Sequence, residues 1–304
     1  MQHYRIISFL CSTLIMLGMA LDGWAHAHGA VDDTFLTPWH AILYAGLFGS
    51  TLWYGWLTRQ QVPPHRPHRM GFALLPIVAV AGGTDFLWHT IFGFEVDISA
   101  QMSPPHILLA CLIATLVAIP SSQRSASGSL SLWGAISGSY AATMMLTLTQ
   151  FLSPLSAVYA ETYSGGDTTR GIGVTGFIIF VAVWLIVLLW MHHHHAPRGA
   201  FLLASLALGS IHAAMSDDWR FVPLLGLCAL IADIRISAFT PRTIAILWAA
   251  TFSVGYFIIL HYAGILMWGP TIWGGTVGMA IAVAYGVSSL TRVTPLPDRQ
   301  GGIS

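Results

Sequence analysis

The segment DGWAHAHGAVDDTFLTPWH, residues 22–40, separates two runs of almost purely apolar residues. It holds three histidines and three aspartates, and such side chains are costly near a lipid bilayer. Apolar runs of about 17–25 residues can cross the hydrocarbon core as helices. The segment and its flanks therefore predict a helical hairpin whose polar turn lies at a membrane face.

The composition of the whole chain is that of a membrane protein. The chain has 304 residues, of which 55% are hydrophobic and only 8% charged, against about 25% charged in a soluble domain. A formal net charge of zero gives no reason to expect nucleic acid as a partner. The three cysteines stand singly inside apolar segments, so they indicate neither a disulfide framework nor a thiolate metal cluster.

Apolar runs recur along the whole sequence and predict an all-α fold, a polytopic integral membrane helical bundle of about ten transmembrane helices. The predicted spans are approximately residues 4–25, 37–58, 70–92, 104–121, 130–152, 172–191, 199–215, 221–238, 243–265 and 271–291. The first four spans contain a tandem helical-hairpin repeat. We therefore divide the chain into residues 1–122, a metal-site hairpin repeat of four helices, and residues 123–304, a C-terminal transmembrane bundle of about six helices.

Arginine sets the expected orientation, because the chain has no lysine and cytoplasmic loops are enriched in basic residues. Ten arginines fall on one side of the predicted threading, and only Arg170 and Arg220 fall on the other. Most acidic residues fall on the side opposite the ten arginines. We expect a multi-pass protein of a bacterial-type inner membrane, with the lipid bilayer as its partner and both termini in the cytoplasm.

The first apolar run has a second interpretation. Its basic start and apolar centre are typical of a signal peptide, and AHA before His28 fits a cleavage site. Cleavage would leave His28 as an N-terminal histidine, which chelates copper. We favour an uncleaved helix, because the pattern described next uses residues on the earlier side of that site.

One arrangement of polar residues occurs twice, as Asp-x3-His at the end of one span and Thr/Ser-Pro-x-His at the start of the next. The first set comprises Asp22, His26 and His40, and the second set comprises Asp85, His89 and His106. Residues four apart share a helix face. Thr37 and Ser103 are expected N-caps, each followed by proline in the first turn. A short loop folds the two helices antiparallel, so each hairpin gathers one carboxylate and two imidazoles at the outer membrane face.

These sets predict metal sites. Two imidazoles and a carboxylate suit a divalent transition metal, and the ligand type alone does not choose among copper, zinc and iron. The partial positive charge of a helix N-terminus favours the neutral imidazole that binds metal. The alternative is a polar hydrogen-bond network that locks each hairpin together.

Additional candidate ligands lie near the same face: His28, Asp33, His212 and His261. We expect His28 and Asp33 to feed or complete the first site and His212 to face it. A buried, hydrogen-bonded role is expected for His261. The sequence MHHHHAPRG, residues 191–199, falls on the opposite side and is expected to be a polar loop.

Two groups of charged residues are given structural roles. Asp217 and Asp218 with Arg220 are expected to form an ion pair in an outer loop, which is worth little. Asp233 and Arg235 lie near the cytoplasmic end of their span and are expected to form a snorkelling pair.

Residues 20–120 resemble the C subunit of copper-dependent membrane monooxygenases, the particulate methane and ammonia monooxygenases. That subunit is similar in carrying Asp-x3-His or Asn-x3-His and then a second histidine about a dozen residues later, in a small-residue-Pro-x-His context. The resemblance implies that Asp22, His26 and His40 hold copper for oxygen activation. The second set matches with a longer gap. Ten spans exceed those of that subunit, and the second half of the chain shows no clear copy of the motif.

Three functions remain open from the sequence. The first is a copper-dependent, monooxygenase-like membrane oxidoreductase acting on a small apolar substrate, in a complex with partner subunits or as a homo-oligomer. The second is a metal-binding or transport protein that captures the ion outside. The third is a structural or assembly subunit without catalysis, in which the polar sets only brace the fold.

Overall fold

The computed structural model describes residues 2–30, 37–93, 102–124, 128–149, 153–156, 159, 162–235 and 239–290. Ten α-helices and one short 3-10 helix form within these ranges, and these ranges contain no strand. The helices are α1 (Gln2–Ala27), α2 (Pro38–Arg59), α3 (His65–Phe92), α5 (Pro104–Ala118), η1 (Ile119–Ser122), α6 (Leu132–Leu148), α7 (Asp167–His193), α8 (Ala200–Ser216), α9 (Phe221–Arg235), α10 (Pro241–Tyr262) and α11 (Pro270–Leu290). Each predicted span corresponds to one of these α-helices, which confirms the all-α class.

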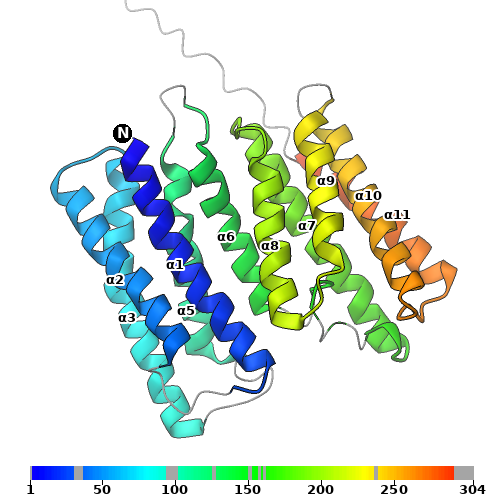
Figure 1. The fold of residues 1–304 in the computed structure, drawn as a ribbon, viewed down its shortest axis with the longest axis horizontal. Helices are drawn as coiled ribbons and strands as arrows, with labels where there is room; N and C mark the ends of the chain where they lie inside the picture. The colour runs from blue at the N-terminus through cyan, green and yellow to red at the C-terminus, as the bar shows by residue number, and fades with distance from the viewer. Residues whose placement is uncertain are drawn as a thin grey trace, which may run out of the picture.

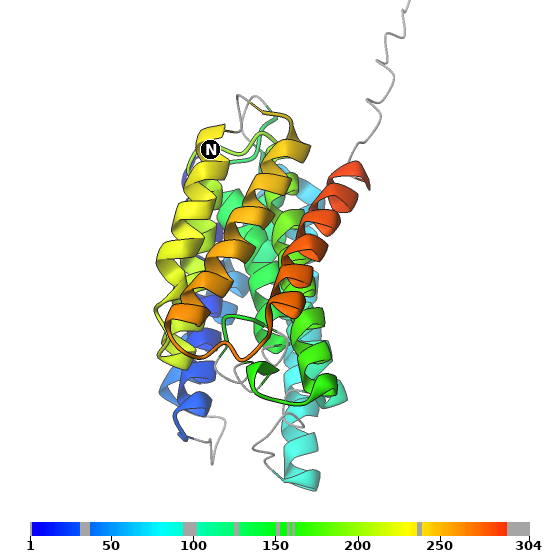
Figure 2. The same ribbon diagram turned by 90° about the vertical axis from the view of Figure 1, so that its right-hand side faces the viewer.

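Successive helices run antiparallel and lie side by side in an elongated bundle (Figure 1). α1 and α2 form the most extensive helix pair, followed by α10 with α11 and α8 with α9. Figures 1 and 2 agree that α1 begins and α11 ends at the same end of the bundle. Each end of the bundle therefore carries the first residues of some helices and the last residues of the helices that precede them in the chain.

Six of these helices are long and apolar enough to cross a membrane, which suits a multi-pass membrane protein. They are α1, α3, α5 with η1, α7, α10 and α11. α6, α8 and α9 have only 17, 17 and 15 residues. At about 1.5 Å per residue, such helices are somewhat shorter than the roughly 30 Å apolar core of a bilayer. Large apolar side chains such as Phe48, Val80 and Ile91 face outward, as lipid contact requires.

Two helices begin at the N-caps that the sequence predicts, and two more begin at N-caps of the same kind. Thr37 and Ser103 are the N-caps of α2 and α5, where each hydroxyl accepts a hydrogen bond from a backbone N–H three residues later and proline fills the first turn. Ser131 and Thr240 cap α6 and α10 in the same way. The predicted N-caps Thr37 and Ser103, which begin the second helix of each hairpin, are thus confirmed.

Two clusters of buried apolar side chains form the interior. One is built from α1, α2, α3, α5 and α6, and the other from α6 through α11. α6 contributes to both, since Ile136 and Tyr140 belong to the first cluster while Ala135 and Leu146 belong to the second. α6 is therefore the helix on which both cores meet.

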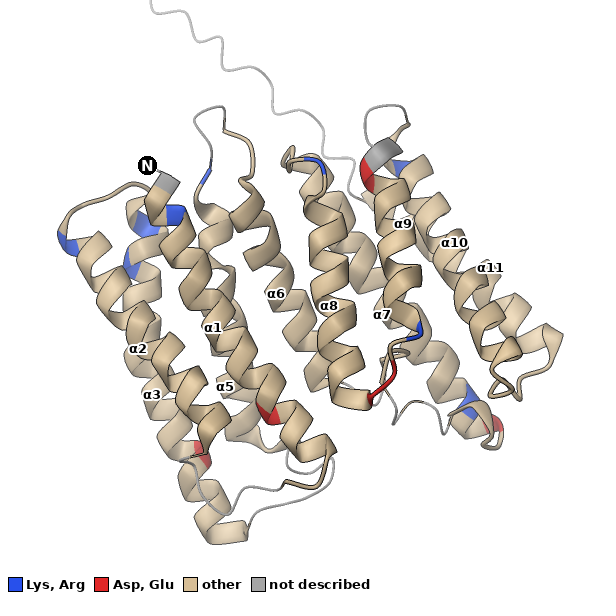
Figure 3. Ribbon diagram, viewed as in Figure 1, with Lys and Arg blue, Asp and Glu red and all other residues tan. Residues whose placement is uncertain are grey.

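Charged residues separate along the bundle axis (Figure 3). The end where α1 begins, here called the arginine end, carries Arg5, Arg59, Arg66, Arg69, Arg124, Arg198 and Arg242. The opposite end, here called the acidic end, carries Asp22, Asp85, Asp167, Asp217 and Asp218 together with Arg170 and Arg220. The segregation inferred from the sequence is therefore present in the fold.

Asp233 has a role that the sequence did not predict, whereas the side chain of Arg235, its expected partner, lies outside what the structure describes. Its buried carboxylate accepts the backbone N–H of Leu202 at 2.8 Å, in the first turn of α8. A helix N-terminus has four N–H groups without partners inside the helix, and a carboxylate there also complements the helix dipole. The cap of α8 is therefore supplied by the neighbouring helix α9, since Gly199 at the N-cap position has no side chain to offer.

Candidate metal centre

The first hairpin cluster consists of Asp22 and His26 on α1 and His40 on α2. The carboxylate lies between the two rings, because Asp22 Oδ1 is 3.5 Å from His26 Nδ1 and 3.5 Å from His40 Nε2. These separations are long for a hydrogen bond. The separation between Asp22 Oδ1 and His40 Nε2 is close to the distance of about 3.4 Å expected between two donors that share a tetrahedral ion with bonds of about 2.1 Å. His26 instead turns Nδ1 toward the carboxylate, so its ring must rotate before Nε2 can share an ion with Asp22.

Each of these two rings also contacts an oxygen other than the Asp22 carboxylate, and these contacts bear on metal binding. His26 Nδ1 lies 3.0 Å from the carbonyl of Asp22, to which it can donate, so Nε2 is the nitrogen available to a metal. His40 Nδ1 lies 3.0 Å from the hydroxyl of Thr37, the residue that caps α2. Metal-binding histidines usually engage their other ring nitrogen with a carbonyl, a carboxylate or a water, which fixes the tautomer. His26 follows that pattern, and Thr37 orients His40 from its own helix start.

The second hairpin cluster, Asp85 and His89 on α3 with His106 on α5, repeats this arrangement. Asp85 Oδ2 is 3.8 Å from His89 Nε2 and 3.8 Å from His106 Nδ1. His89 Nδ1 in turn lies 3.3 Å from the carbonyl of Gly93, just past the end of α3. The tandem repeat predicted from sequence therefore places a carboxylate between two imidazoles twice, both times at the acidic end.

Asp85 is the most deeply buried ionisable group in either cluster, at 4% exposure. Its Oδ1 atom is buried and accepts no hydrogen bond. A buried carboxylate without compensation costs several kcal/mol. Either a proton shared with the imidazoles or a bound cation must balance it.

The donor chemistry fits a transition metal, and the geometry fits in part. Among the residues that the structure describes, no group of three or more histidine, cysteine or acidic side chains is arranged to hold an ion as it stands. In each cluster the carboxylate approaches both rings, but the three donors do not converge on one point. Binding therefore requires side-chain rotation, most easily of His26, whose ring is exposed.

His28 does not complete the first cluster but links it to the other half of the bundle. Its Nε2 donates to Asp217 Oδ2 at 2.8 Å, and its Nδ1 donates to the carbonyl of Trp24 at 2.7 Å. Both contacts are to acceptor oxygens, so the doubly protonated ring satisfies both at once. The hydrogen bond to Asp217 accordingly raises the pKa of His28, and the bond to Trp24 adds to the rise.

The remaining predicted ligands lie apart from the clusters. His212 is buried in α8, where its Nδ1 donates to the carbonyl of Leu208 and its Nε2 has no hydrogen-bond partner. His261 is exposed at the end of α10, so the expectation of a buried, hydrogen-bonded histidine is wrong. Asp33 lies outside the described residues.

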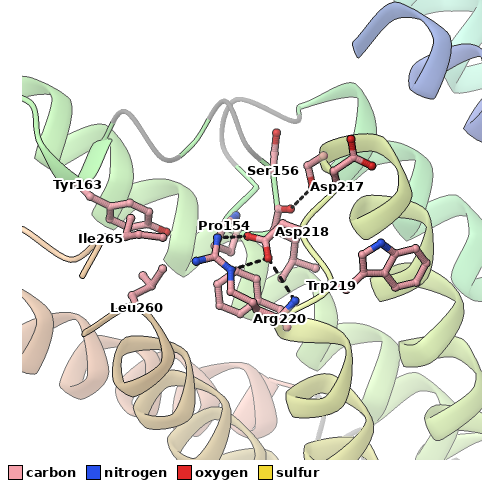
Figure 4. A pocket seen from close by; sticks show the side chains of 12 residues that line it. Pro154, Ser156, Tyr163, Asp217, Asp218, Trp219, Arg220, Leu260 and Ile265 are labelled. Carbon is pink, nitrogen blue, oxygen red and sulfur yellow. Dashed lines mark hydrogen bonds and ion pairs between the residues drawn. The ribbon is translucent and has the colours of Figure 1, made fainter. Parts of the chain in front are cut away.

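A pocket of about 510 Å³ opens at the acidic end beside the turn from α8 to α9 (Figure 4). Asp218 and Arg220 form the predicted ion pair within it, with Arg220 Nε 2.7 Å from Asp218 Oδ1. Burial opposes ionisation of Asp218, but the hydrogen bonds from Arg220 outweigh it and lower the pKa of that carboxyl. Asp217 also lines the pocket, so the salt link to His28 lies on its rim.

Sequence reasoning missed a buried hydrogen-bond chain that joins two lining residues of this pocket, Pro154 and Tyr163, through Tyr256 behind them. The hydroxyls of Tyr163 and Tyr256 hydrogen-bond to each other, and Tyr256 donates to the carbonyl of Pro154 at 2.7 Å. These residues lie as far as 102 positions apart in the chain. A single sequence carries no local pattern that pairs them.

No family model, curated protein or solved structure matches this chain. Function must therefore be inferred from the side chains that the fold brings together.

Proposed function

We propose that this chain is an integral membrane metalloprotein that binds a transition metal, most favourably copper, through the hairpin clusters at its acidic end. The observation that supports the proposal is the duplicated placement of one carboxylate between two imidazoles, at 3.5 Å in the first hairpin and 3.8 Å in the second. Two imidazoles and a carboxylate suit copper, zinc and iron alike. The likeness to copper membrane monooxygenases favours copper.

The charge of the clusters separates this proposal from a simple hydrogen-bond lock. Asp85 is buried with an unbonded oxygen, and no arginine is paired with it among the described residues. A divalent ion would balance the carboxylate without protonating either imidazole. A hydrogen-bond lock without metal would instead need a proton on the cluster to balance the carboxylate, so the presence of bound metal decides between the two.

The finer assignments are part of the same proposal. All ten described α-helices cross the bacterial inner membrane, both termini lie in the cytoplasm, and the acidic end faces outward. The charge segregation of Figure 3 supports this orientation, because basic residues are retained on the cytoplasmic side. Bound copper would supply oxygen activation toward a small apolar substrate, with partner subunits completing the enzyme. A metal-transfer role uses the same ligands.

Metal analysis of the protein purified in native lipid tests the proposal. Wild type is compared with the double variant His26→Ala/His40→Ala and with the double variant His89→Ala/His106→Ala. His261→Ala is the matched control, since it removes an exposed histidine at the same end that belongs to neither cluster. We expect stoichiometric copper in wild type and in the control, and a loss of copper in each double variant that destroys an occupied site.

Electron paramagnetic resonance adds the identity of the donors. Cu(II) held by imidazole shows nitrogen couplings, which should disappear with the copper in the double variants. Wild type that folds with no bound metal of any kind, and whose double variants only lose thermal stability, would instead establish the structural lock.

A further inference from the structure

An apolar groove lies near the arginine end, remote from both hairpin clusters. Its volume is about 580 Å³, and its walls come from the start of α3, the outer side of α5 with η1, and α6. Met70, Thr115, Ala118 and Met145 are among the lining residues. The groove opens sideways from the bundle rather than into its interior, because Thr115 and Met70 are exposed.

The length of the groove matches one leaflet of a bilayer. On α5 and η1 its lining runs from Cys111 to Ser122. The α-helical part rises about 1.5 Å per residue and the 3-10 part about 2.0 Å, so this stretch spans roughly 18 Å, somewhat more than half of the ~30 Å apolar thickness of a membrane. An acyl chain from a single leaflet has this length, whereas a partner transmembrane helix would need a groove along the whole span.

The end of the groove nearest the arginine end is polar. Ser121 and Ser122 of η1 contribute hydroxyls to its lining. Arg66 and Arg69 stand beside the lining residues Pro67 and Met70 on the first turns of α3, and both arginines are exposed. The spacing of three places Arg66 and Arg69 on one helix face.

The two arginines have no anionic partner within the described part of the chain. No described carboxylate forms an ion pair with either of them. Asp233, the described acid that lies at the same end, is engaged by the backbone of α8. Neither arginine lines the groove itself, but both lie on the first turns of α3, which border it. Two guanidinium groups without a described acidic partner, beside an apolar, leaflet-length groove, complement a lipid with a phosphate head group.

We propose that this groove is a binding site for an anionic glycerophospholipid of the leaflet at the arginine end. One acyl chain lies along α5 between α3 and α6, and the phosphate lies between Arg66 and Arg69. The head group carries net negative charge, so phosphatidylglycerol is bound in preference to the zwitterionic phosphatidylcholine.

Cys111 provides a reporter inside the groove. It is exposed and lines the groove, whereas Cys11 and Cys228 are buried. The experiment measures the rate at which a maleimide labels Cys111 in detergent-purified, delipidated full-length protein as lipid is added. We expect phosphatidylglycerol to protect Cys111 at a concentration about tenfold lower than phosphatidylcholine. Native mass spectrometry should retain one phosphatidylglycerol per chain.

Two variants decide the assignment. Arg66→Gln/Arg69→Gln should abolish the preference for phosphatidylglycerol in both measurements. Arg59→Gln is the matched control: it removes an exposed arginine from the same end, on α2, which packs against α3 through Gly55 and Phe72 rather than through the groove. Equal protection by both lipids, or an equal loss of preference in Arg59→Gln, would overturn the proposal.

Discussion

At the scale of single residues, Thr37 links the fold to the candidate site. Its hydroxyl accepts the backbone N–H of His40 and also contacts His40 Nδ1 at 3.0 Å. One side chain thus begins α2 and fixes the ring whose other nitrogen faces Asp22. The sequence suggested the first role through Thr-Pro-x-His, but only the structure shows the second.

Replacing Thr37 separates these roles. Thr37→Val should destabilise the protein by about 1 kcal/mol through the lost cap and weaken metal binding by about 10–100-fold through the lost orientation of His40. Thr37→Ser keeps the hydroxyl and should preserve both properties. Thermal unfolding and metal titration measure the two effects. Unchanged metal affinity in Thr37→Val would show that the ring is positioned by other contacts.

The His28 imidazolium makes a second residue-scale prediction. Its pKa is raised in the folded protein, so the link to Asp217 is fully present below the ordinary histidine pKa of about 6.5 and is lost as pH rises through the folded pKa. Asp217→Asn should lower the pKa of His28 toward its ordinary value, as measured by NMR of labelled histidine.

Asp218→Asn is the control for that titration, since Asp218 pairs with Arg220 and not with His28. An identical His28 pKa in wild type and Asp217→Asn would show that the link is not formed in solution. Because the pair is exposed, we expect little change in overall stability from either variant.

At the scale of helices, close packing of α1 on α2 sets the geometry of the first cluster. A Cβ atom on Gly18 would lie 2.5 Å from the backbone nitrogen of Leu43, and a Cβ on Gly46 would lie 2.7 Å from that of Ile15. Small residues allow this approach between membrane helices. Since Asp22 lies one turn beyond Gly18 on α1, the distance between the helices controls whether its carboxylate reaches His40.

Gly18→Val should force the two helices apart. We expect a loss of about 1–3 kcal/mol in stability and a weaker metal site, although no ligand is altered. Gly83→Val, which replaces a glycine with open space around it on α3, is the matched control. Stability in bilayer or detergent and bound metal are both measured. Equal effects of the two variants would argue against the close contact.

The cap of α8 by α9 gives a further prediction for helices. Asp233→Ala removes a buried acceptor from the N–H groups of α8 and should cost about 1–3 kcal/mol of unfolding free energy. Asp167→Ala is the comparison, because Asp167 is exposed in the first turn of α7 and is paired only with Arg170 at 3.6 Å. It should cost at most about 1 kcal/mol. Chemical unfolding in detergent distinguishes the two losses.

At the scale of the whole molecule, the predictable features were those with local causes. Hydropathy located all ten described α-helices, and the Thr/Ser-Pro pairs located two helix starts because caps and first-turn prolines act within a few residues. The two hairpin clusters were predictable for the same reason, since a short loop returns the chain to the same place.

Features with distant causes were not predictable. The link from His28 to Asp217 joins residues 189 positions apart, and the cap supplied by Asp233 spans 31 positions. His261 was misjudged because an apolar neighbourhood in sequence signals either a protein interior or a lipid-facing surface. The same ambiguity left the apolar groove near the arginine end unpredicted, because its walls are apolar helices that resemble the other helices in sequence.

The position of α6 in both cores has a consequence for chain connectivity. A break within residues 125–127 would leave α6 on the second polypeptide, with Ile136 and Tyr140 still presented toward the first four helices. The two polypeptides, produced together in one cell, would therefore keep the packing interface between α6 and the first four helices, and we expect them to reassemble. A break placed after α6 would instead leave the second piece without Ala135 and Leu146, and its own interior would be incomplete.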